Sequence, residues 1–183
     1  AIEAELKEGT EDAYEAMMAL VPKSGSNTIS DADYALLAQY LDLEQFADYM
    51  ILNIYGQNYD WPRKNWYCAA MRGTNAAGPP AHRFHFYAWD FESTLGSYFQ
   101  DRTLIGDNYG ERVGPAQIYY KLRRHPEFQR LFGDRLHRNF FNNGALTPAA
   151  NIARWYARMR EIEGPMVCES ARWGDYRTPG APY

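Results

Sequence analysis

The chain has 183 residues, of which 46% are hydrophobic and 23% are charged, a composition typical of a single globular domain. Its formal net charge is −4, and no basic run is long enough to indicate a nucleic-acid surface. No stretch approaches the roughly 18–20 consecutive apolar residues that span a membrane. These properties argue against disorder across the whole chain, a membrane span and a nucleic-acid partner.

Aromatic residues are unusually frequent, with 15 Tyr, 9 Phe and 5 Trp. This content favours extensive aromatic packing, and the alternative is a wall for a flat ligand such as a base or a sugar. Cys68 and Cys168 lie far apart without a CxxC motif. A buried thiol pair is therefore favoured over a metal site, with a disulfide as the other alternative.

The first third of the chain carries the signals of three helices. Residues 3–21 have apolar residues at helical spacing, and Thr10 is predicted to cap a restart of this helix. Because the chain begins inside this pattern, we expect it to be a piece of a longer protein. The second and third helices are predicted to begin at Ser30 with Asp33 and at Asp42 with Gln45, and the third to end at Gly56.

The middle of the chain changes from helical to strand-like sequence. The stretches NWYCAAMR and HRFHFYAWD are rich in aromatic residues, and the turn-like TNAAGPPA separates them. They predict a β-hairpin over about residues 65–90, followed by a long irregular loop over residues 91–114. Three more helices are predicted to start at Gly114-Pro115, Pro126 and Thr147-Pro148, the first ending at Arg124, the second near Gly144 and the third interrupted at Gly164-Pro165.

These elements predict an α+β, mainly helical fold with one β-hairpin. We expect residues 1–173 to form one domain and residues 174–183 to be a linker or tail.

The predicted hairpin brings polar residues from separate positions to its open end. If the numbers of opposed residues sum to about 155, Asn65 lies opposite Asp90. Asp60 stands one short loop before the first strand, and Glu92 follows just beyond the second. Carboxylate and carboxamide oxygens suit Mg²⁺ that is completed by water and phosphate oxygens. An acid outside the metal shell can receive the proton of an attacking hydroxyl, as phosphoryl transfer requires.

Each of these residues also has a purely structural interpretation. Asp60 can form a turn by accepting a backbone N–H, Asn65 can be a strand-start residue, and Asp90 can cap the end of a strand. Arg63 and Lys64 can offset phosphate charge or form a solvated pair. The functional interpretation is favoured because an Asp-x4-Asn spacing, a predicted hairpin and a further Asp follow one another along the chain.

That order matches a pattern of protein kinases, in which a catalytic Asp-x4-Asn precedes a short hairpin and a metal-binding Asp-Phe-Gly. Here DWPRKN has the Asp-x4-Asn spacing, and DFE stands where Asp-Phe-Gly would. The match has three departures: NY replaces the His-Arg before the catalytic Asp, Glu replaces the Gly, and the hairpin is longer.

The stretch NIYGQNYDWPRKNWY, followed by RFHFYAWDFESTLG, resembles the spore coat protein H (CotH) kinase family of secreted or envelope-associated atypical kinases. KLRRHPEFQRLFGDRLHRNFFNNGALTP and the ARWGDYR ending resemble its C-terminal helices, so the resemblance covers about residues 31–177. It implies an atypical protein-kinase-like C-terminal lobe in which Asp60 is the catalytic acid. It also implies that Asn65 and Asp90 bind metal, with Glu92 as a further metal-binding acid.

The resemblance further implies Mg²⁺ or Mn²⁺ and ATP as cofactors, and Ser/Thr of secreted or cell-envelope proteins as acceptors. The chain has no Gly-rich phosphate loop and no obvious strand Lys paired with a helix Glu. We therefore expect the small lobe that clamps ATP to lie upstream, and weak or no activity from this chain alone. The alternatives are an inert surface-assembly or binding module of the same fold, and a carbohydrate-active enzyme with Asp60 and Glu92 as paired carboxylates.

Overall fold

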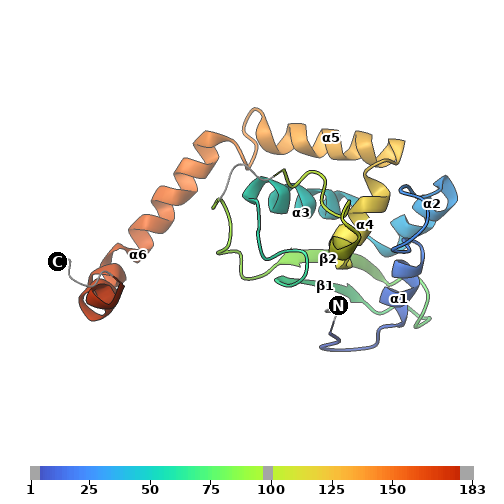
Figure 1. The fold of residues 1–183 in the computed structure, drawn as a ribbon, viewed down its shortest axis with the longest axis horizontal. Helices are drawn as coiled ribbons and strands as arrows, with labels where there is room; N and C mark the ends of the chain where they lie inside the picture. Colours follow the sequence, from blue (N-terminus) through green and yellow to red (C-terminus); the bar gives the residue numbers. More distant parts are fainter. Residues whose placement is uncertain (1–4, 97–100, 178–183) are drawn as a thin grey trace. The chain divides into compact units, whose positions relative to one another are not determined.

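The computed structural model describes residues 5–96 and 101–177, and the chain divides into two compact units, Ala1–Leu136 and His137–Tyr183 (Figure 1). Within the described residues there are six α-helices and one two-stranded antiparallel sheet, which confirms the α+β, mainly helical fold class. In chain order the elements are α1 (Asp12–Ala19), α2 (Asp31–Tyr40), α3 (Leu43–Gly56), β1 (Trp66–Met71), β2 (His82–Ala88), the short 3₁₀ helix η1 (Tyr109–Glu111), α4 (Gly114–Leu122), α5 (Pro126–Phe140) and α6 (Pro148–Arg177).

The starts of α2 and α3 follow the predicted capping chemistry. The hydroxyl of Ser30 accepts a hydrogen bond from the backbone N–H of Asp33 (3.1 Å). The carboxylate of Asp42 accepts one from the backbone N–H of Gln45 (3.1 Å). Each bond satisfies a backbone donor that the first helical turn leaves unpaired, and α3 ends at Gly56 as predicted.

The start of α1 differs from the prediction. The helix begins at Asp12, and the residue before it is Glu11, which makes no side-chain capping bond, so the prediction of a Thr10 cap is wrong. Residues 5–11 lie outside the helix, and residues 1–4 lie outside the described part of the chain. Burial of Met17 in the core holds α1 in place, because tertiary packing stabilises a short helix more than its caps do.

The hairpin packs one face against α3, which lies beside both strands in Figure 1. Phe84 and Phe86 of β2 are buried in a core that also contains Phe46 of α3. The carboxamide of Gln45 accepts a hydrogen bond from the backbone N–H of Phe86 (2.9 Å) and donates one to its carbonyl. Because both backbone groups of Phe86 are held, β2 has a fixed position along α3.

At the open end of the hairpin, the register differs by one residue from the prediction. The two strands are antiparallel, with an irregularity between Ala69 and Met71. At the open end, the backbone N–H of Trp89 donates to the carbonyl of Asn65 (3.1 Å). Asn65 is therefore opposite Trp89 and not opposite Asp90. An irregularity of this kind changes the pairing of every residue on one side of it, and a sequence pattern does not reveal it.

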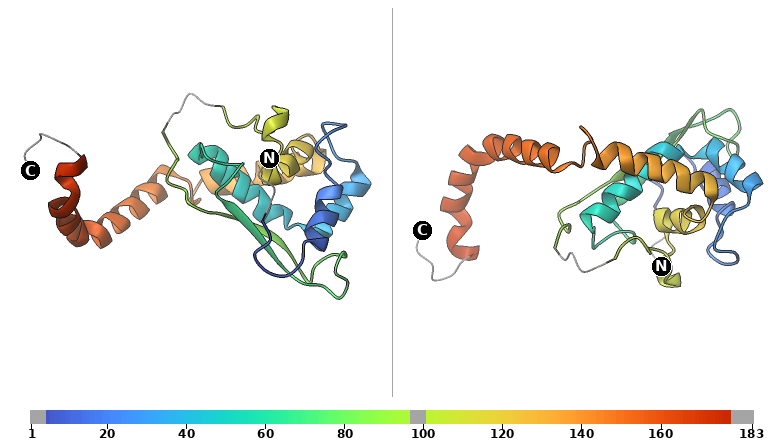
Figure 2. Two further views of the ribbon diagram at one scale, coloured as in Figure 1. Left: turned by 60° about the horizontal axis from the view of Figure 1, so that its bottom comes forward. Right: turned by 90° about the horizontal axis from the view of Figure 1, so that it is seen from above.

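The C-terminal helices begin where the sequence predicts, but α6 is longer than expected. It continues through Pro165 to Arg177, so the predicted interruption is wrong. A proline inside a helix removes one hydrogen bond and bends the helix axis, and the axis of α6 changes direction along its length in Figure 2. The helix extends past residue 174, where we expected a tail, and residues 178–183 lie outside the described range.

Among the helices of the described residues, none combines the length and the apolar character that crossing a membrane requires.

Candidate functional site

The candidate site lies at the open end of the hairpin, between the loop that precedes β1 and the segment that follows β2. The side-chain amide of Asn65 donates to Oδ2 of Asp60 (3.5 Å) and to the backbone carbonyl of Asp90 (3.4 Å). Because one carboxamide contacts both partners, three residues that are far apart in sequence lie together. The structure thus places Asp60, Asn65 and Asp90 at the end of the hairpin where the sequence argument expected them to meet.

Two of these residues have a left-handed backbone. The φ angle is 64° at Asn65 and 52° at Asp90. Left-handed conformations are uncommon outside glycine, although Asn and Asp adopt them more readily than other residues. Unusual backbone conformations of this kind gather at functional sites, where the surrounding structure holds them. Here each stands next to the end of a strand, so both side chains leave the hairpin at the same place.

Glu92 adds a second carboxyl group beside Asp90. A side-chain hydrogen bond with Asp90 raises the pKa of the exposed Glu92 carboxyl, and the negative charges of Asp90 and Asp60 raise it further. Like charges this close disfavour full ionisation of both groups, and a bound cation would relieve the repulsion.

The oxygen donors at this end suit a hard divalent cation. Asn65 offers a carboxamide oxygen, and Asp90 and Glu92 offer carboxylates. In the part of the chain that the structure describes, no three His, Cys, Asp or Glu side chains form a ready-made metal cage. Mg²⁺ is commonly held by one or two carboxylates and completed by water and phosphate oxygens, so the donor set fits Mg²⁺ delivered with a phosphate ligand.

Lys64 contributes a positive charge to the site. Its Nζ lies 3.0 Å from Oδ2 of Asp60, and the exposed fraction of the side chain is 57% for Lys64 and 24% for Asp60. The hydrogen bond and charge of Asp60, with smaller effects of Asp90 and Glu92, raise the pKa of Lys64. The sequence left open whether Lys64 contacts the site or is solvated, and the structure pairs it with Asp60. An i,i+4 ion pair in a loop has no sequence signal of its own.

The loop that carries Asp60 is held by a buried indole. Trp61 is 2% exposed, and its Nε1 donates to the hydroxyl of Tyr49 on α3 (2.6 Å). The peptide bond between Trp61 and Pro62 is cis. Further along, Nε1 of Trp66 donates to the carbonyl of Pro62 (2.8 Å), which closes the loop onto the first residue of β1. These contacts fix the loop on both sides of the stretch that separates Asp60 from Asn65.

Backbone hydrogen bonds hold the residues before Asp60. The backbone N–H of Asn58 donates to the carbonyl of Asn53 (3.1 Å), and the Asn58 side chain donates to that of Asn53 (3.1 Å). Both Asn side chains are buried. The backbone N–H of Tyr59 donates to the carbonyl of Ser93 (2.9 Å), which ties the loop to the segment after Asp90. The sequence feature that could have predicted this anchor is Asn53, a polar residue within the otherwise apolar face of α3.

Phe91 docks the segment after β2 onto the end of α3. A Cβ at Gly56 would lie 2.9 Å from the ring of Phe91, so only glycine leaves room for the ring. The backbone N–H of Leu95 also donates to the carbonyl of Gly56 (2.7 Å). The glycine that ends α3 therefore also positions the two acidic residues on either side of Phe91.

The outer face of the hairpin carries exposed aromatic rings next to these polar groups. Tyr67 and Tyr87 stack with ring centroids 4.9 Å apart, and Trp89 meets Tyr67 edge-to-face at 6.3 Å. Their exposed fractions are 48%, 39% and 64%, respectively. Of the two explanations for the aromatic content, packing accounts for the inner face of the hairpin, and this outer face can receive a flat ligand.

The sequence model of one family, described as CotH kinase protein, matches residues 2–180. No curated protein and no solved structure matches the chain.

Proposed function

Because the chain belongs to the CotH kinase family, we propose that its hairpin end is the phosphate and metal half of a site for Mg²⁺-ATP-dependent phosphoryl transfer. The acceptors are Ser or Thr hydroxyls of secreted or cell-envelope proteins. One observation carries the proposal, namely the carboxamide of Asn65 placed between Asp60 and Asp90. Phosphoryl transfer needs a group that orients the nucleophile beside groups that hold the metal, and this arrangement supplies both.

Asn65, Asp90 and Glu92 are the proposed metal-binding residues. The amide nitrogen of Asn65 faces Asp60 and the carbonyl of Asp90, which leaves its side-chain oxygen for the cation. The carboxylates of Asp90 and Glu92 complete the protein ligands. Bound Mg²⁺ would neutralise charge on the phosphates of ATP.

Asp60 is the proposed catalytic residue, which orients the acceptor hydroxyl and takes its proton. In the structure Lys64 covers Oδ2 of Asp60, but the lysine side chain is the more exposed partner. Exposed ion pairs of this kind are weak because water screens them, so the polyanionic nucleotide competes readily for Lys64. The exposed rings of Tyr67 and Trp89 lie along the same end of the hairpin and suit the base of the nucleotide.

The test uses the full-length protein with Asp60→Asn and Asp90→Asn. Each variant should lose about 10²–10⁴-fold in phosphate transfer to protein Ser/Thr, the range expected for a positioned acid–base group. Mg²⁺-ATP should still raise the melting temperature of Asp60→Asn, whereas Asp90→Asn should lose this rise, because a ligand stabilises only the form that binds it.

A matched control is Asp101→Asn, which changes an exposed acid whose carboxylate accepts hydrogen bonds from the backbone N–H and the hydroxyl of its near neighbour Thr103. This variant should keep both transfer and the rise in melting temperature. Wild-type transfer in both site variants would refute the assignment. Absence of any Mg²⁺-ATP effect on wild-type protein would instead favour an inert binding module of the same fold.

A further inference from the structure

Arg102 reaches from the segment after the hairpin to the loop that carries Asp60. Its Nη2 donates to the carbonyl of Asn58 (2.9 Å) and to the carbonyl of Tyr59 (3.1 Å). The guanidinium carbon also lies 5.9 Å from the centroid of the Tyr59 ring. One cation therefore holds the two consecutive carbonyls that precede Asp60.

These two bonds determine the orientation of the backbone at Asp60. The carbonyl of Tyr59 and the nitrogen of Asp60 belong to one planar peptide group, so fixing the carbonyl fixes the plane. The N–H groups of Asn58 and Tyr59 are held from the other side, by α3 and by Ser93. Arg102 thus completes a set of hydrogen bonds that holds both the N–H and the carbonyl groups of the two residues before Asp60.

The guanidinium is suited to this task and has no other evident role. Hydrogen bonds from a charged donor are about twice as strong as neutral ones, and the planar fork of arginine loses little freedom in forming two of them. Nε of Arg102 is buried and has no hydrogen-bond partner within residues 5–96 and 101–177. No carboxylate forms an ion pair with Arg102 among the described residues, so its contacts are directed at the loop.

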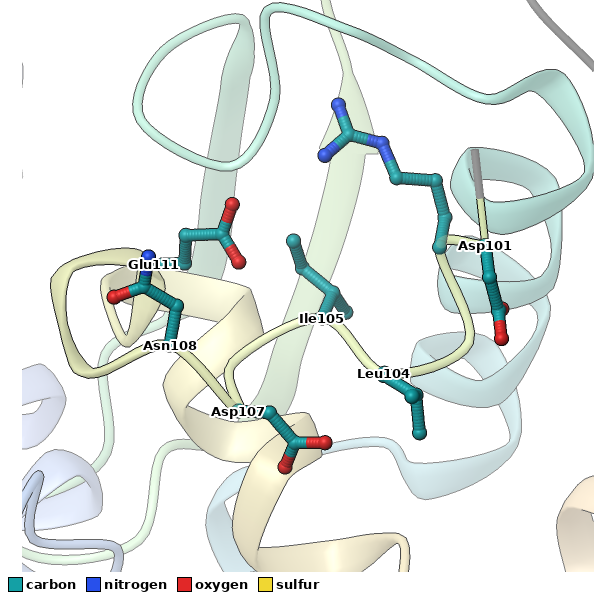
Figure 3. Close-up of a pocket in the computed structure, with 7 residues that line it drawn as sticks. Asp101, Leu104, Ile105, Asp107, Asn108 and Glu111 are labelled. Atoms are coloured by element: carbon teal, nitrogen blue, oxygen red, sulfur yellow. The ribbon is translucent and has the colours of Figure 1, made fainter. Parts of the chain in front are cut away.

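The segment that carries Arg102 is itself anchored and presents a hollow to solvent. Arg112 donates to the carbonyls of Gly106 (2.7 Å), Asp107 (3.2 Å) and Lys23 (3.2 Å), which fastens the segment to other loops. A cavity of about 380 Å³ lies within the segment (Figure 3). Its lining residues include Arg102 and the labelled Ile105 and Glu111. The side chain of Arg102 therefore connects the loop of Asp60 to a separate surface segment.

We propose that Arg102 is a positioning residue for Asp60, which holds the catalytic carboxylate in the direction of the acceptor hydroxyl. This inference rests on the proposed function, since it acts through Asp60. Misplacement of a catalytic group by about 1 Å can cost about 10²-fold in rate, so removal of both bonds should be visible in kcat.

The test uses the full-length protein and the variants Arg102→Met and Arg102→Lys. Arg102→Met should lower kcat about 10- to 100-fold while the KM for ATP and the stabilisation by Mg²⁺-ATP stay unchanged, because the metal ligands are not touched. Arg102→Lys keeps a charged donor and should recover part of the rate. In an Asp60→Asn background, Arg102→Met should not reduce the residual rate any further, since residues that act as a unit are not additive.

Arg112→Met is the matched control, because it removes another arginine of the same segment whose side-chain hydrogen bonds, among the described residues, go to the carbonyls of Gly106, Asp107 and Lys23 and not to the Asp60 loop. It should lower kcat much less than Arg102→Met does. An equal loss in Arg112→Met, or a full further loss when Arg102→Met is added to Asp60→Asn, would overturn the inference. If Arg102→Met does not fold, Arg102→Lys in the two backgrounds gives the same comparison. Wild-type activity of Asp60→Asn would instead refute the proposed function.

Discussion

Replacement of Gly114 by alanine tests how closely the start of α4 fits against the hairpin. Gly114 has a φ of +47°, and a Cβ at this position would lie 2.3 Å from Cζ2 of Trp66. A left-handed backbone costs a residue with a Cβ about 1–2 kcal/mol, and overpacking typically costs about 1–3 kcal/mol. Gly114→Ala should therefore lower the free energy of unfolding by about 2–5 kcal/mol.

The ring of Trp66 cannot move aside at little cost. Its Nε1 donates to the carbonyl of Pro62 (2.8 Å), and its ring packs against that of Phe86 with centroids 5.6 Å apart. Relief of the clash must break one of these contacts or shift the backbone of Gly114. Since Trp66 directly follows Asn65, the disturbance should also reach the candidate site.

The matched control is Gly25→Ala, which has the same kind of backbone without the close contact. Gly25 has a φ of +79°, and a Cβ there would meet no atom within 4 Å. Both glycines belong to the same compact unit, so urea unfolding followed by tryptophan fluorescence reports on both. Gly25→Ala should cost only the conformational part, about 1–2 kcal/mol. Equal losses in the two variants would refute the reasoning about Trp66.

Four further outcomes can be measured on the same chain. Tyr49→Phe removes the acceptor of the buried indole N–H of Trp61, so it should lower the free energy of unfolding in urea by about 1–3 kcal/mol. A smaller loss would show that this hydrogen bond is dispensable. Gly133→Ala, in α5 with no atom near its Cβ, should instead raise the stability by about 0.5–1 kcal/mol in the same assay, and a loss would contradict an open position. Burial raises the pKa of the Cys68 thiol to about 12, whereas Cys168 is exposed. Iodoacetamide at mildly alkaline pH should therefore modify Cys168 first. Equal rates of modification by mass spectrometry would contradict the burial of Cys68. Because the pKa of Cys68 in the folded state lies above its ordinary value of 9.0, stability should also fall as the pH rises above 9.0.

The sequence predicted elements well where short-range chemistry determines them. Ser30 caps α2 because a hydroxyl at that position satisfies an unpaired N–H, and this requires no knowledge of the rest of the fold. Thr10 failed as a cap because α1 is stabilised by burial of Met17, a tertiary effect that the local pattern does not contain. Pro165 failed as an interruption because a long helix can accept a proline by bending.

The candidate site was predictable in its position but not in its contacts. The hairpin alone brings Asn65 near Asp90, and the one-residue error in register did not separate them because a carboxamide reaches across that distance. The ion pair of Lys64 and the bonds of Arg102 could not be predicted. The ion pair of Lys64 depends on a side-chain rotamer. The hydrogen bonds of Arg102 join it to Tyr59 and Asn58, which lie 43 and 44 positions earlier in the sequence.

The contacts divide the candidate site into a fixed part and a movable part. The backbone at Asp60 is held by bonds to α3, to Ser93 and to Arg102, and the backbone of Asn65 continues into β1. Lys64 and Glu92 are exposed; the charge of Lys64 is paired with that of Asp60, whereas the charges of Asp90 and Asp60 repel that of Glu92. Under the proposed function, binding of Mg²⁺ and a polyphosphate would make exposed charged side chains exchange partners while the backbone at Asp60 and Asn65 stays in place. Little of the binding free energy would then be lost in arranging these two residues.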